Sequence, residues 1–304
     1  MFFPAIKLKF QRYVVRLILL EFSAMLKLVI NADDFGFSET VNEAILKSFR
    51  FGILRSTSIM ANGKSFDYAV GIIKSNPDLD IGVHLTLVEE KPILNSEKLH
   101  SLVVDSGHFH KHAIDFTKKY FSEKISLEEV RKELTAQIEK LLDLGIKVSH
   151  IDSHKHLHIL PRILDITIDL ANRYKIKFIR IPKEKFSAYM FANFKSVYKI
   201  AQMAALNYFC SKAKEKISFK TDHFAGFYFG GKLSKQNLIT LINHLPANGN
   251  CELMCHPGLE DVSNLNNFSH YRKVEEAEVL IHQEVAQIIK MKNIEITSFQ
   301  KLIH

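Results

Sequence analysis

The chain has 304 residues, which exceeds the ~100–200 residues of an average domain, although single α/β barrels commonly reach ~200–250. Its composition of 47% hydrophobic and 24% charged residues, with 12 Gly and 7 Pro, is that of an ordered globular protein. This excludes collagen-like, low-complexity and wholly disordered chains. The 41 Lys and Arg against 33 Asp and Glu give a net charge of +8, which favours an anionic neighbour such as nucleic acid, a membrane surface or an acidic ligand without choosing among them.

The cysteines, Cys210, Cys251 and Cys255, are too few and too irregularly spaced for a disulfide framework or a four-ligand zinc site. Reduced thiols and a cytoplasmic location are therefore expected. Charged residues interrupt every apolar run before it reaches the ~18 residues of a membrane-spanning helix. The sequence thus predicts a chain without a membrane span.

Residues 1–24 mix apolar with basic side chains. Arg16 interrupts the apolar centre that a secretory signal requires, so a cleaved signal is not expected. The segment then has two interpretations: a basic amphipathic stretch that touches an anionic membrane, or an extension upstream of a true start at Met25. We favour the second, which divides the chain into an extension over 1–24 and one domain over 25–304.

From Leu26 onward, short apolar runs alternate with amphipathic segments, which is the pattern of parallel strands connected by helices. Strands are predicted at 27–31, 55–60, 80–86, 147–153, 177–181, 219–225, 251–255 and 294–297. Helices are predicted at 39–51, 65–75, 127–144, 161–174, 189–215, 235–245 and 271–292. The pattern predicts an α/β fold: a single TIM-barrel-like domain, an irregular (β/α) barrel whose catalytic groups lie at the C-terminal ends of the strands.

Capping residues predict where two of these helices begin. Ser38 and Gly52 flank the first helix as its N-cap and its stop signal. Ser126 and Glu129 have the spacing of a capping box at the start of 127–144. In such a box each side chain accepts a hydrogen bond from the backbone amide of the other residue.

Two adjacent carboxylates, Asp33 and Asp34, directly follow the first predicted strand and precede the turn at Gly36. Adjacent carboxylates repel, and burial of both is costly unless a cation or hydrogen bonds compensate. The pair therefore suits one metal ligand beside one general base. An Asx turn ahead of the Ser38 cap is the structural alternative, and on these residues alone it stands equal to catalysis.

Histidines also occur in two later predicted strands. His84 stands alone in the strand at 80–86, where a histidine is more often a core residue than a ligand. Five candidate ligands then occupy alternate positions: His150, Asp152, His154, His156 and His158. An extended backbone would point all five to one face of the sheet. Imidazoles beside a carboxylate are ligands of Zn²⁺ or another divalent transition metal, and a surface histidine run is the weaker alternative.

The seventh predicted strand ends in Glu252-Leu-Met-Cys255-His256-Pro-Gly258, so a histidine again follows an apolar strand and precedes a turn. A loop histidine satisfied by a backbone carbonyl is the structural alternative. Four polar strand ends in one βα chain nevertheless indicate one shared site, since the C-terminal ends of barrel strands meet at one face.

In combination these motifs resemble the YdjC-like carbohydrate deacetylases, a family that includes chitooligosaccharide deacetylases and a hopanoid-biosynthesis-associated group. The resemblance covers most of the chain after Met25. It rests on N-A-D-D-F-G at 31–36, G-V-H-L-T at 82–86, H-I-D-S-H-K-H-L-H at 150–158 and E-L-M-C-H-P-G at 252–258. It implies a TIM-barrel-like fold, one divalent metal ion and hydrolysis of the acetamide of an N-acetylated sugar or glycolipid. Mg²⁺ and Zn²⁺ are the first candidates for the metal, with Mn²⁺ and Fe²⁺ as alternatives.

Carried over to this chain, the resemblance implies Asp34, His84 and His154 as metal ligands. It likewise implies Asp33 as general base and His256 as general acid. One Asp and two His would leave coordination positions open for water and for the substrate carbonyl. The metal would polarise that carbonyl, Asp33 would take a proton from the water, and His256 as an imidazolium would stabilise or protonate the departing amine.

Five further residues are candidates for orienting the metal ligands or for contacting sugar hydroxyls: Asp152, His156, His158, Asp222 and His223. The last two belong to a late segment that resembles the hopanoid-associated group and would border the pocket. The Lys- and aromatic-rich segment 183–220 carries no family motif. We interpret it as an amphipathic helix with a solvated basic face or as the edge of a pocket for a large or lipid-linked substrate.

Two other functions fit parts of the pattern. A metal-dependent phosphoesterase would use similar ligands, but the motifs supply ligands for about one ion, whereas two-metal enzymes need more bridging carboxylates. A basic nucleic-acid-binding protein would explain the charge of +8, yet the basic residues are dispersed and no binding motif is present. We therefore expect an enzyme with an N-acetylated sugar or glycolipid substrate and no nucleic-acid partner. The sequence leaves a peripheral membrane contact and a homodimer open.

Overall fold

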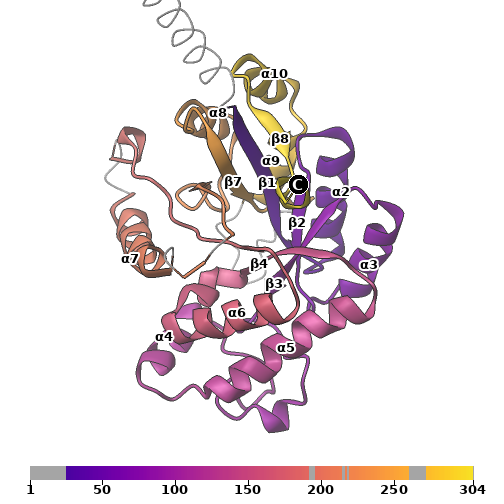
Figure 1. Cartoon of the computed structure of the whole chain (residues 1–304), viewed down its shortest axis with the longest axis vertical. Helices are drawn as coiled ribbons and strands as arrows, with labels where there is room; N and C mark the ends of the chain where they lie inside the picture. Colours follow the sequence, from indigo (N-terminus) through magenta and orange to yellow (C-terminus); the bar gives the residue numbers. More distant parts are fainter. Residues whose placement is uncertain (1–24, 192–195, 214–215, 218, 260–271, 304) are drawn as a thin grey trace, which may run out of the picture.

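The computed structural model describes residues 25–191, 196–213, 216–217, 219–259 and 272–303 (Figure 1). Parallel strands form one curled sheet: β1 (Leu26–Phe35), β2 (Ser56–Ile59), β3 (Asp80–Leu85), β4 (Val148–Ser153), β5 (Phe178–Ile179), β6 (His223–Ala225), β7 (Gly249–Cys255) and β8 (Glu295–Thr297). Each strand overlaps one predicted strand, so this part of the sequence prediction is confirmed. The extension over 1–24 lies outside the described residues.

The order of the strands makes the barrel irregular. The sheet runs β5-β4-β3-β2-β1-β7-β6, and β8 also pairs with β1. β7 follows one edge of β1 over 26–32, whereas β8 and β2 share the other edge, β8 beside 27–29 and β2 beside 31–35. A regular eightfold barrel would place β8 between β7 and β1. The chain instead forms a TIM-barrel-like half-barrel in a single α/β domain, in agreement with the predicted fold class.

Helices connect these strands and surround the curled sheet (Figure 1). They are α2 (Glu39–Phe51), α3 (Phe66–Ser75), α4 (Ala113–Phe121), α5 (Leu127–Asp143), α6 (Pro161–Arg173), α7 (Val197–Ala213), α8 (Lys235–Asn243), α9 (Lys273–Leu280), α10 (Gln283–Met291) and α11 (Phe299–Leu302). Three short 3-10 helices are η1 (Ser96–Lys98), η2 (His154–Ile159) and η3 (Ala188–Phe191). Most of the long helices lie where the sequence predicts them.

The helix predictions were wrong in three places. The helix predicted at 271–292 is two helices, because His282 caps α10 by accepting a hydrogen bond from the Glu284 amide at 3.2 Å. The helix predicted at 189–215 is η3 followed by α7, with 192–195 outside the described residues. α4 was missed because its N-cap, His112, makes no side-chain capping bond that the sequence could have signalled.

One capping prediction is confirmed in full, and the other is confirmed in part. Ser38 accepts the amide hydrogen of Val41 at 3.3 Å, as predicted for α2. Ser126 accepts the amide hydrogen of Glu129 at 3.4 Å, but the Glu129 carboxylate does not return to Ser126. It accepts instead from the amide and hydroxyl of Ser101, at 2.9 and 2.7 Å, and the Ser101 hydroxyl accepts from the Ser126 amide at 2.8 Å. Ser101 thus links Glu129 to Ser126 in place of the direct hydrogen bond of a capping box.

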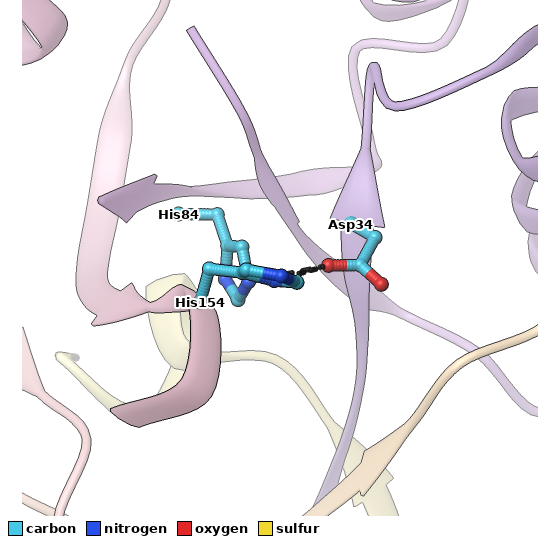
Figure 2. Close-up of side chains that lie close together, drawn as sticks. All are labelled: Asp34, His84 and His154. Atoms are coloured by element: carbon cyan, nitrogen blue, oxygen red, sulfur yellow. Dashed lines mark hydrogen bonds and ion pairs between the residues drawn. The ribbon is translucent and has the colours of Figure 1, made fainter. Parts of the chain in front are cut away.

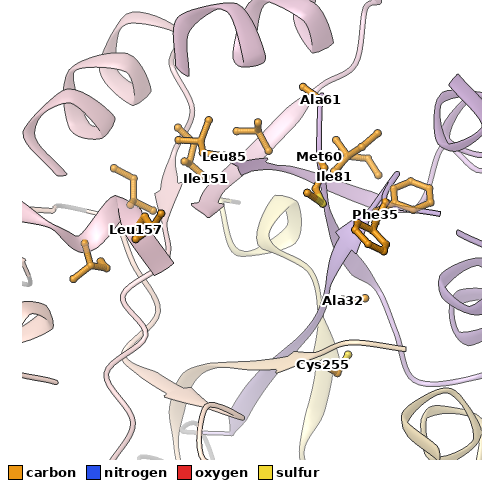
Figure 3. Packing of buried hydrophobic residues seen from close by; sticks show 14 of the residues in the cluster. Ala32, Phe35, Met60, Ala61, Ile81, Leu85, Ile151, Leu157 and Cys255 are labelled. Carbon is orange, nitrogen blue, oxygen red and sulfur yellow. The ribbon is translucent and has the colours of Figure 1, made fainter. Parts of the chain in front are cut away.

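Apolar side chains from β1, β3, β4 and η2 pack into one core (Figure 3). Both faces of a parallel sheet are covered by other parts of the protein, so the sequences of its strands are nearly continuous apolar runs. In β1 every residue except Lys27 is buried. At Asp34 the backbone enters the left-handed region, with φ of 65°. The rigid strand therefore ends in a turn that presents two acids to the C-terminal face of the sheet.

Candidate active site

Asp34, His84 and His154 converge at the C-terminal ends of β1, β3 and β4 (Figure 2). Asp34 Oδ1 lies 3.0 Å from His154 Nδ1 and 3.4 Å from His84 Nε2. All three residues are buried, and one ligand atom from each lies within 4.8 Å of the other two. The fold therefore brings these three side chains together, as predicted.

Asp152 fixes the orientation of His84. His84 Nδ1 donates to Asp152 Oδ1 at 2.8 Å, which turns Nε2 toward Asp34. Burial alone would lower the pKa of His84, but the charge and hydrogen bond of Asp152, together with the hydrogen bond of Asp34 and the charge of Asp33, outweigh it and raise that pKa to about 10. A carboxylate that holds the remote nitrogen of a ligand histidine is common at metal sites, because it fixes the ring and increases its basicity.

Glu89 plays the same part for His154, and sequence reasoning missed it. His154 Nε2 lies 2.9 Å from Glu89 Oε2, which leaves Nδ1 facing Asp34. Lys155 Nζ lies 3.6 Å from the other carboxylate oxygen of Glu89. Glu89 and Lys155 both have left-handed backbones, with φ of 73° and 55°. Only the fold brings Glu89 here, since it follows β3 in a loop and carries no strand-end signal.

The donor set fits one divalent cation. Asp34 Oδ2 is buried and has no hydrogen-bond partner among the described residues, although Lys273 Nζ lies 3.8 Å away. Burial would raise the pKa of Asp34, but the charge and hydrogen bond of His154, together with the hydrogen bond of His84, lower it well below its ordinary value. Two imidazole nitrogens and an ionised carboxylate are a ligand set of transition-metal sites.

Asp33, His84 and Asp152 also lie close enough together to hold an ion. In that grouping, however, Arg180 already occupies carboxylate oxygens of both acids. Its Nη2 lies 2.8 Å from Asp152 Oδ2, and its Nη1 and Nη2 donate to Asp33 at 2.6 and 2.7 Å. The grouping around Asp34 is therefore the better place for a cation.

Arg180 is the centre of a fully buried ionic network that the sequence analysis did not identify. Besides Asp33 and Asp152, it contacts Glu252, whose Oε1 accepts from Arg180 Nε at 2.6 Å. Burial would lower the pKa of Arg180, but the three carboxylates raise it well above its ordinary value. The available signal was a charged residue inside the strand predicted at 177–181, and the structure ends β5 directly before it, at Ile179. Asn31 adds a bond to Asp33 Oδ1 at 3.0 Å.

His256 lies beside Asp33 at the end of β7. Its Nε2 is 3.9 Å from Asp33 Oδ2, and its backbone amide donates to Glu276 at 2.5 Å. Burial lowers the pKa of His256 to about 4, although Asp33 and Asp34 act in the opposite direction. The ring is therefore neutral near pH 7. His256 would therefore have to take up a proton before it could act as the expected imidazolium.

A family model of YdjC-like proteins matches residues 27–291. The chain belongs to the YdjC-like family. A carbohydrate deacetylase of Clostridium beijerinckii is 31% identical over 91% of this chain and 100% of its own. One of Thermoanaerobacter pseudethanolicus is 30% identical over 90% and 98%. A crystal structure of an Enterococcus faecalis protein named for cellobiose-phosphate cleavage has a TM-score of 0.70 and 28% identity, over 92% of this chain and 99% of its own.

The histidine motif of this YdjC-like chain does not remain extended, which corrects the prediction of one face. β4 ends at Ser153, and the backbone then turns into η2, where Lys155 and His156 have φ of 55° and 56°. His154 and His156 line the site. His158 turns into the protein, where it bonds the Ser153 hydroxyl at 2.6 Å and the Arg180 carbonyl at 2.9 Å. His158 therefore packs against the backbone of Arg180 and does not line the cavity.

His150 and the pair Asp222 and His223 also lie away from the site. The His150 ring stacks on Phe299, with 4.0 Å between centroids, deep inside the half-barrel. Asp222 accepts the Asn250 amide at 2.9 Å, and with His223 it lines a separate cavity of about 260 Å³. Because β6 begins at His223, both residues stand at its N-terminal end, whereas the site of this YdjC-like fold forms at C-terminal ends. The structure thus corrects their placement at the pocket border.

A cavity of about 410 Å³ opens over the site. Its polar wall contains Asp33, His84, His154, Lys155, His156 and His256. The other lining residues include the apolar Ala113, Leu157, Leu160, Ala205, Leu206, Phe209, Phe227 and Met254 and the polar Thr117, Lys199 and Gln202. Burial lowers the pKa of His156 well below its ordinary value, and its Nδ1 has no hydrogen-bond partner among the described residues. No helix within the part of this YdjC-like chain that the structure describes is long and apolar enough to cross a membrane.

Proposed function

We propose that the chain is a metal-dependent N-deacetylase that removes the acetyl group from an N-acetylhexosamine in a saccharide or glycolipid. The observation that carries the proposal is the buried convergence of Asp34, His84 and His154, at a cavity that His84 and His154 line together with Asp33 and His256. Relatives named carbohydrate deacetylases match over nearly their whole length, which supports deacetylation of a sugar. The buried, free cysteines fit the reducing cytoplasm that we propose as its location.

Asp34, His84 and His154 would hold one divalent ion. Two imidazoles beside one carboxylate favour Zn²⁺, Mn²⁺ or Fe²⁺ over Mg²⁺, which prefers oxygen ligands. When bound, such an ion supplies Lewis acidity that polarises the amide carbonyl and lowers the pKa of water. Asp152 and Glu89 would keep the two imidazoles in the tautomers that the ion requires.

We infer that Asp33 acts as the general base. Arg180 and Asn31 hold its carboxylate rigidly, and Asp33 lines the cavity where the substrate would lie. It takes a proton from the water that adds to the acetamide carbon. Neutral His256, with Nε2 3.9 Å from Asp33 Oδ2, takes that proton from Asp33 and delivers it to the amine nitrogen as the C–N bond breaks, which returns both residues to their starting protonation states. Acetate and the free amino sugar are the products.

Acetate release decides between this reaction and phosphoester hydrolysis. The full chain is assayed with N,N′-diacetylchitobiose, with N-acetylglucosaminyl lipid and with p-nitrophenyl phosphate, each before and after chelation and after return of Zn²⁺ or Mn²⁺. We expect acetate from at least one N-acetylated substrate, loss of that activity on chelation, and its return with metal. Phosphate release without acetate release would contradict the proposal. The contacts of Arg180 with both Asp33 and Asp152 argue against a second metal and hence against a two-metal phosphoesterase.

A further inference from the structure

Two polar residues, Glu133 and Gln137, lie on the buried side of α5. Both are fully buried, one turn apart. A polar group among apolar side chains costs free energy unless it is hydrogen-bonded. The partners of Glu133 and Gln137 therefore indicate what these two residues do. The other buried residues of α5 are apolar: Val130, Leu134, Ile138 and Leu141.

Gln137 binds the backbone of Thr86, which directly follows β3. Its Nε2 donates to the Thr86 carbonyl at 2.7 Å, and its Oε1 accepts from the Thr86 amide at 2.8 Å. A neighbouring strand can offer a residue the same pair of bonds, so the side-chain amide takes the place of a strand. Gln137 thereby fixes the beginning of the loop 86–94.

Glu133 binds the other end of the same loop. Its Oε1 accepts from the Ile93 amide at 2.9 Å, and its Oε2 accepts from the Leu94 amide at 3.1 Å. Gln137 Nε2 also donates to Glu133 Oε1 at 2.8 Å, which connects the two side chains. One turn of α5 therefore holds both ends of the loop 86–94.

Glu89 lies in the middle of this loop. Its left-handed backbone, with φ of 73°, costs free energy and persists only where the surrounding structure holds it. The His110 carbonyl accepts the Glu89 amide at 2.9 Å, and Glu89 Oε2 lies 2.9 Å from His154 Nε2. α5 thus holds the ends of the loop and His110 its middle, which keeps the carboxylate beside the imidazole of a candidate metal ligand.

We propose that Glu133 and Gln137 are positioning residues for the metal site and that they act on it through the loop 86–94 and Glu89. The proposal rests on the proposed metal-dependent function. It makes metal affinity depend on a helix whose side chains bond the loop and not the ion. The alternative is that the two residues only stabilise the fold, in which case their loss would lower stability and leave metal affinity unchanged.

The size of the effect follows from the role of Glu89. Loss of the partner of a ligand histidine typically lowers metal affinity ~10–100-fold. Loss of the Glu133 carboxylate leaves Glu89 in the chain but frees one end of its loop, so Glu89 would spend part of its time away from His154. The loss of affinity should therefore be smaller, about three- to tenfold.

Competition with a chromogenic chelator measures the Zn²⁺ affinity of the full chain and its variants. We expect Glu133→Met and Gln137→Met to lower that affinity about three- to tenfold, and Glu133→Gln, which keeps one acceptor oxygen, to recover part of the loss. Leu141→Ala is the matched control, since it shortens a fully buried side chain on the same side of α5 and leaves the loop bonds in place. Circular dichroism and urea unfolding check that each variant is folded under the assay conditions.

The control separates positioning from stability. We expect Leu141→Ala to bind Zn²⁺ like the wild type although its urea midpoint falls. Equal affinity in the wild type, Glu133→Met and Gln137→Met would overturn the proposal and leave a purely structural role. An equal loss of affinity in Leu141→Ala would also overturn it, because the effect would then follow from stability alone. A wild-type chain that binds neither Zn²⁺ nor Mn²⁺ would instead contradict the metal-dependent function, and this proposal with it.

A double-mutant cycle tests the route through Glu89, with Glu133 as its other member. Gln137 is less suitable, because the hydroxyl of its partner Thr86 also donates to the His84 carbonyl at 3.0 Å. In the Glu89→Ala chain, Glu133→Met should lower Zn²⁺ affinity by no more than about 1.5-fold, since the carboxylate that Glu133 positions is already absent. Equal fold losses in the wild-type and Glu89→Ala chains would show that Glu133 acts by another route and would overturn the proposal.

Discussion

His84 Nδ1 donates to Asp152 Oδ1 at 2.8 Å, and Asp152 Oδ2 in turn lies 2.8 Å from Arg180 Nη2. The same guanidinium binds both oxygens of Asp33. One buried network thus connects a candidate metal ligand to the candidate general base. Because every link is a charge-assisted bond in a region of low polarity, removal of Arg180 or Asp152, which each contact two other members, is expected to displace the others.

The two neighbouring acids should separate metal binding from turnover. Asp34→Asn should lower metal affinity and activity together, because Asp34 contributes the carboxylate of the metal site. Asp33→Asn should keep the metal but lose ~10²–10⁴-fold in kcat, which is the usual cost of removing a general base. Calorimetric metal titration beside steady-state rates measures both effects, and Asp165→Asn on the surface is the control. If Asp33→Asn loses the metal while Asp34→Asn retains it, the two roles are reversed.

Arg180 should be a main determinant of stability. Arg180→Met removes the guanidinium and leaves Asp33, Asp152 and Glu252 buried beside one another, so the free energy of unfolding should fall by about 3–5 kcal/mol. Arg131→Met, which removes an exposed ion pair with Asp169, should cost less than about 1 kcal/mol. Urea unfolding followed by circular dichroism gives both values. Equal stability of the two variants would mean that the network contributes nothing net to folding.

The tendency of functional side chains to lie at the C-terminal ends of parallel strands accounts for the site residues that the sequence predicted. Asp33, Asp34, His84, His154 and His256 each lie at or just beyond the end of an apolar strand, and parallel strands bring those ends to one face. Local chemistry and periodicity are sufficient for that inference.

The remaining site residues depend on tertiary structure. Arg180 follows a strand of two residues, which gave too short an apolar run to emphasise its end. Glu89 sits in a loop, and Lys273 begins a helix far along the chain. The prediction of one extended histidine face was wrong because Lys155 and His156 adopt left-handed backbones. This conformation is uncommon for residues other than glycine, and no alternation of polarity signals it.

Glu89 should raise metal affinity without binding the metal. It holds His154 Nε2 at 2.9 Å, and removal of such a partner typically lowers affinity ~10–100-fold. Glu89→Gln should therefore show weaker binding of Zn²⁺ in a competition assay with a chromogenic chelator, and Glu89→Asp should recover part of it. Exposed Glu97→Gln is the control. Unchanged affinity in Glu89→Gln would show that His154 is oriented by its backbone alone.

Glu252 should make stability depend on pH. Burial, which outweighs the charge of Arg180, raises the pKa of Glu252 to about 7, above the ~4.3 of an unfolded glutamate. The folded state therefore binds a proton more tightly, and the stability from that proton is present below the unfolded pKa and is lost as pH rises through about 7.

Glu252→Gln keeps an acceptor for Arg180 Nε but cannot ionise, so it should escape that loss. The difference in unfolding free energy between this variant and wild type should shift in favour of the variant by on the order of 2–3 kcal/mol from about pH 5 to about pH 8.5. Urea unfolding at both pH values measures the shift, and comparison with wild type cancels other titrating groups. Exposed Glu278→Gln should show no such shift. A constant difference would mean that Glu252 is ionised throughout, so that Arg180 would face three full negative charges.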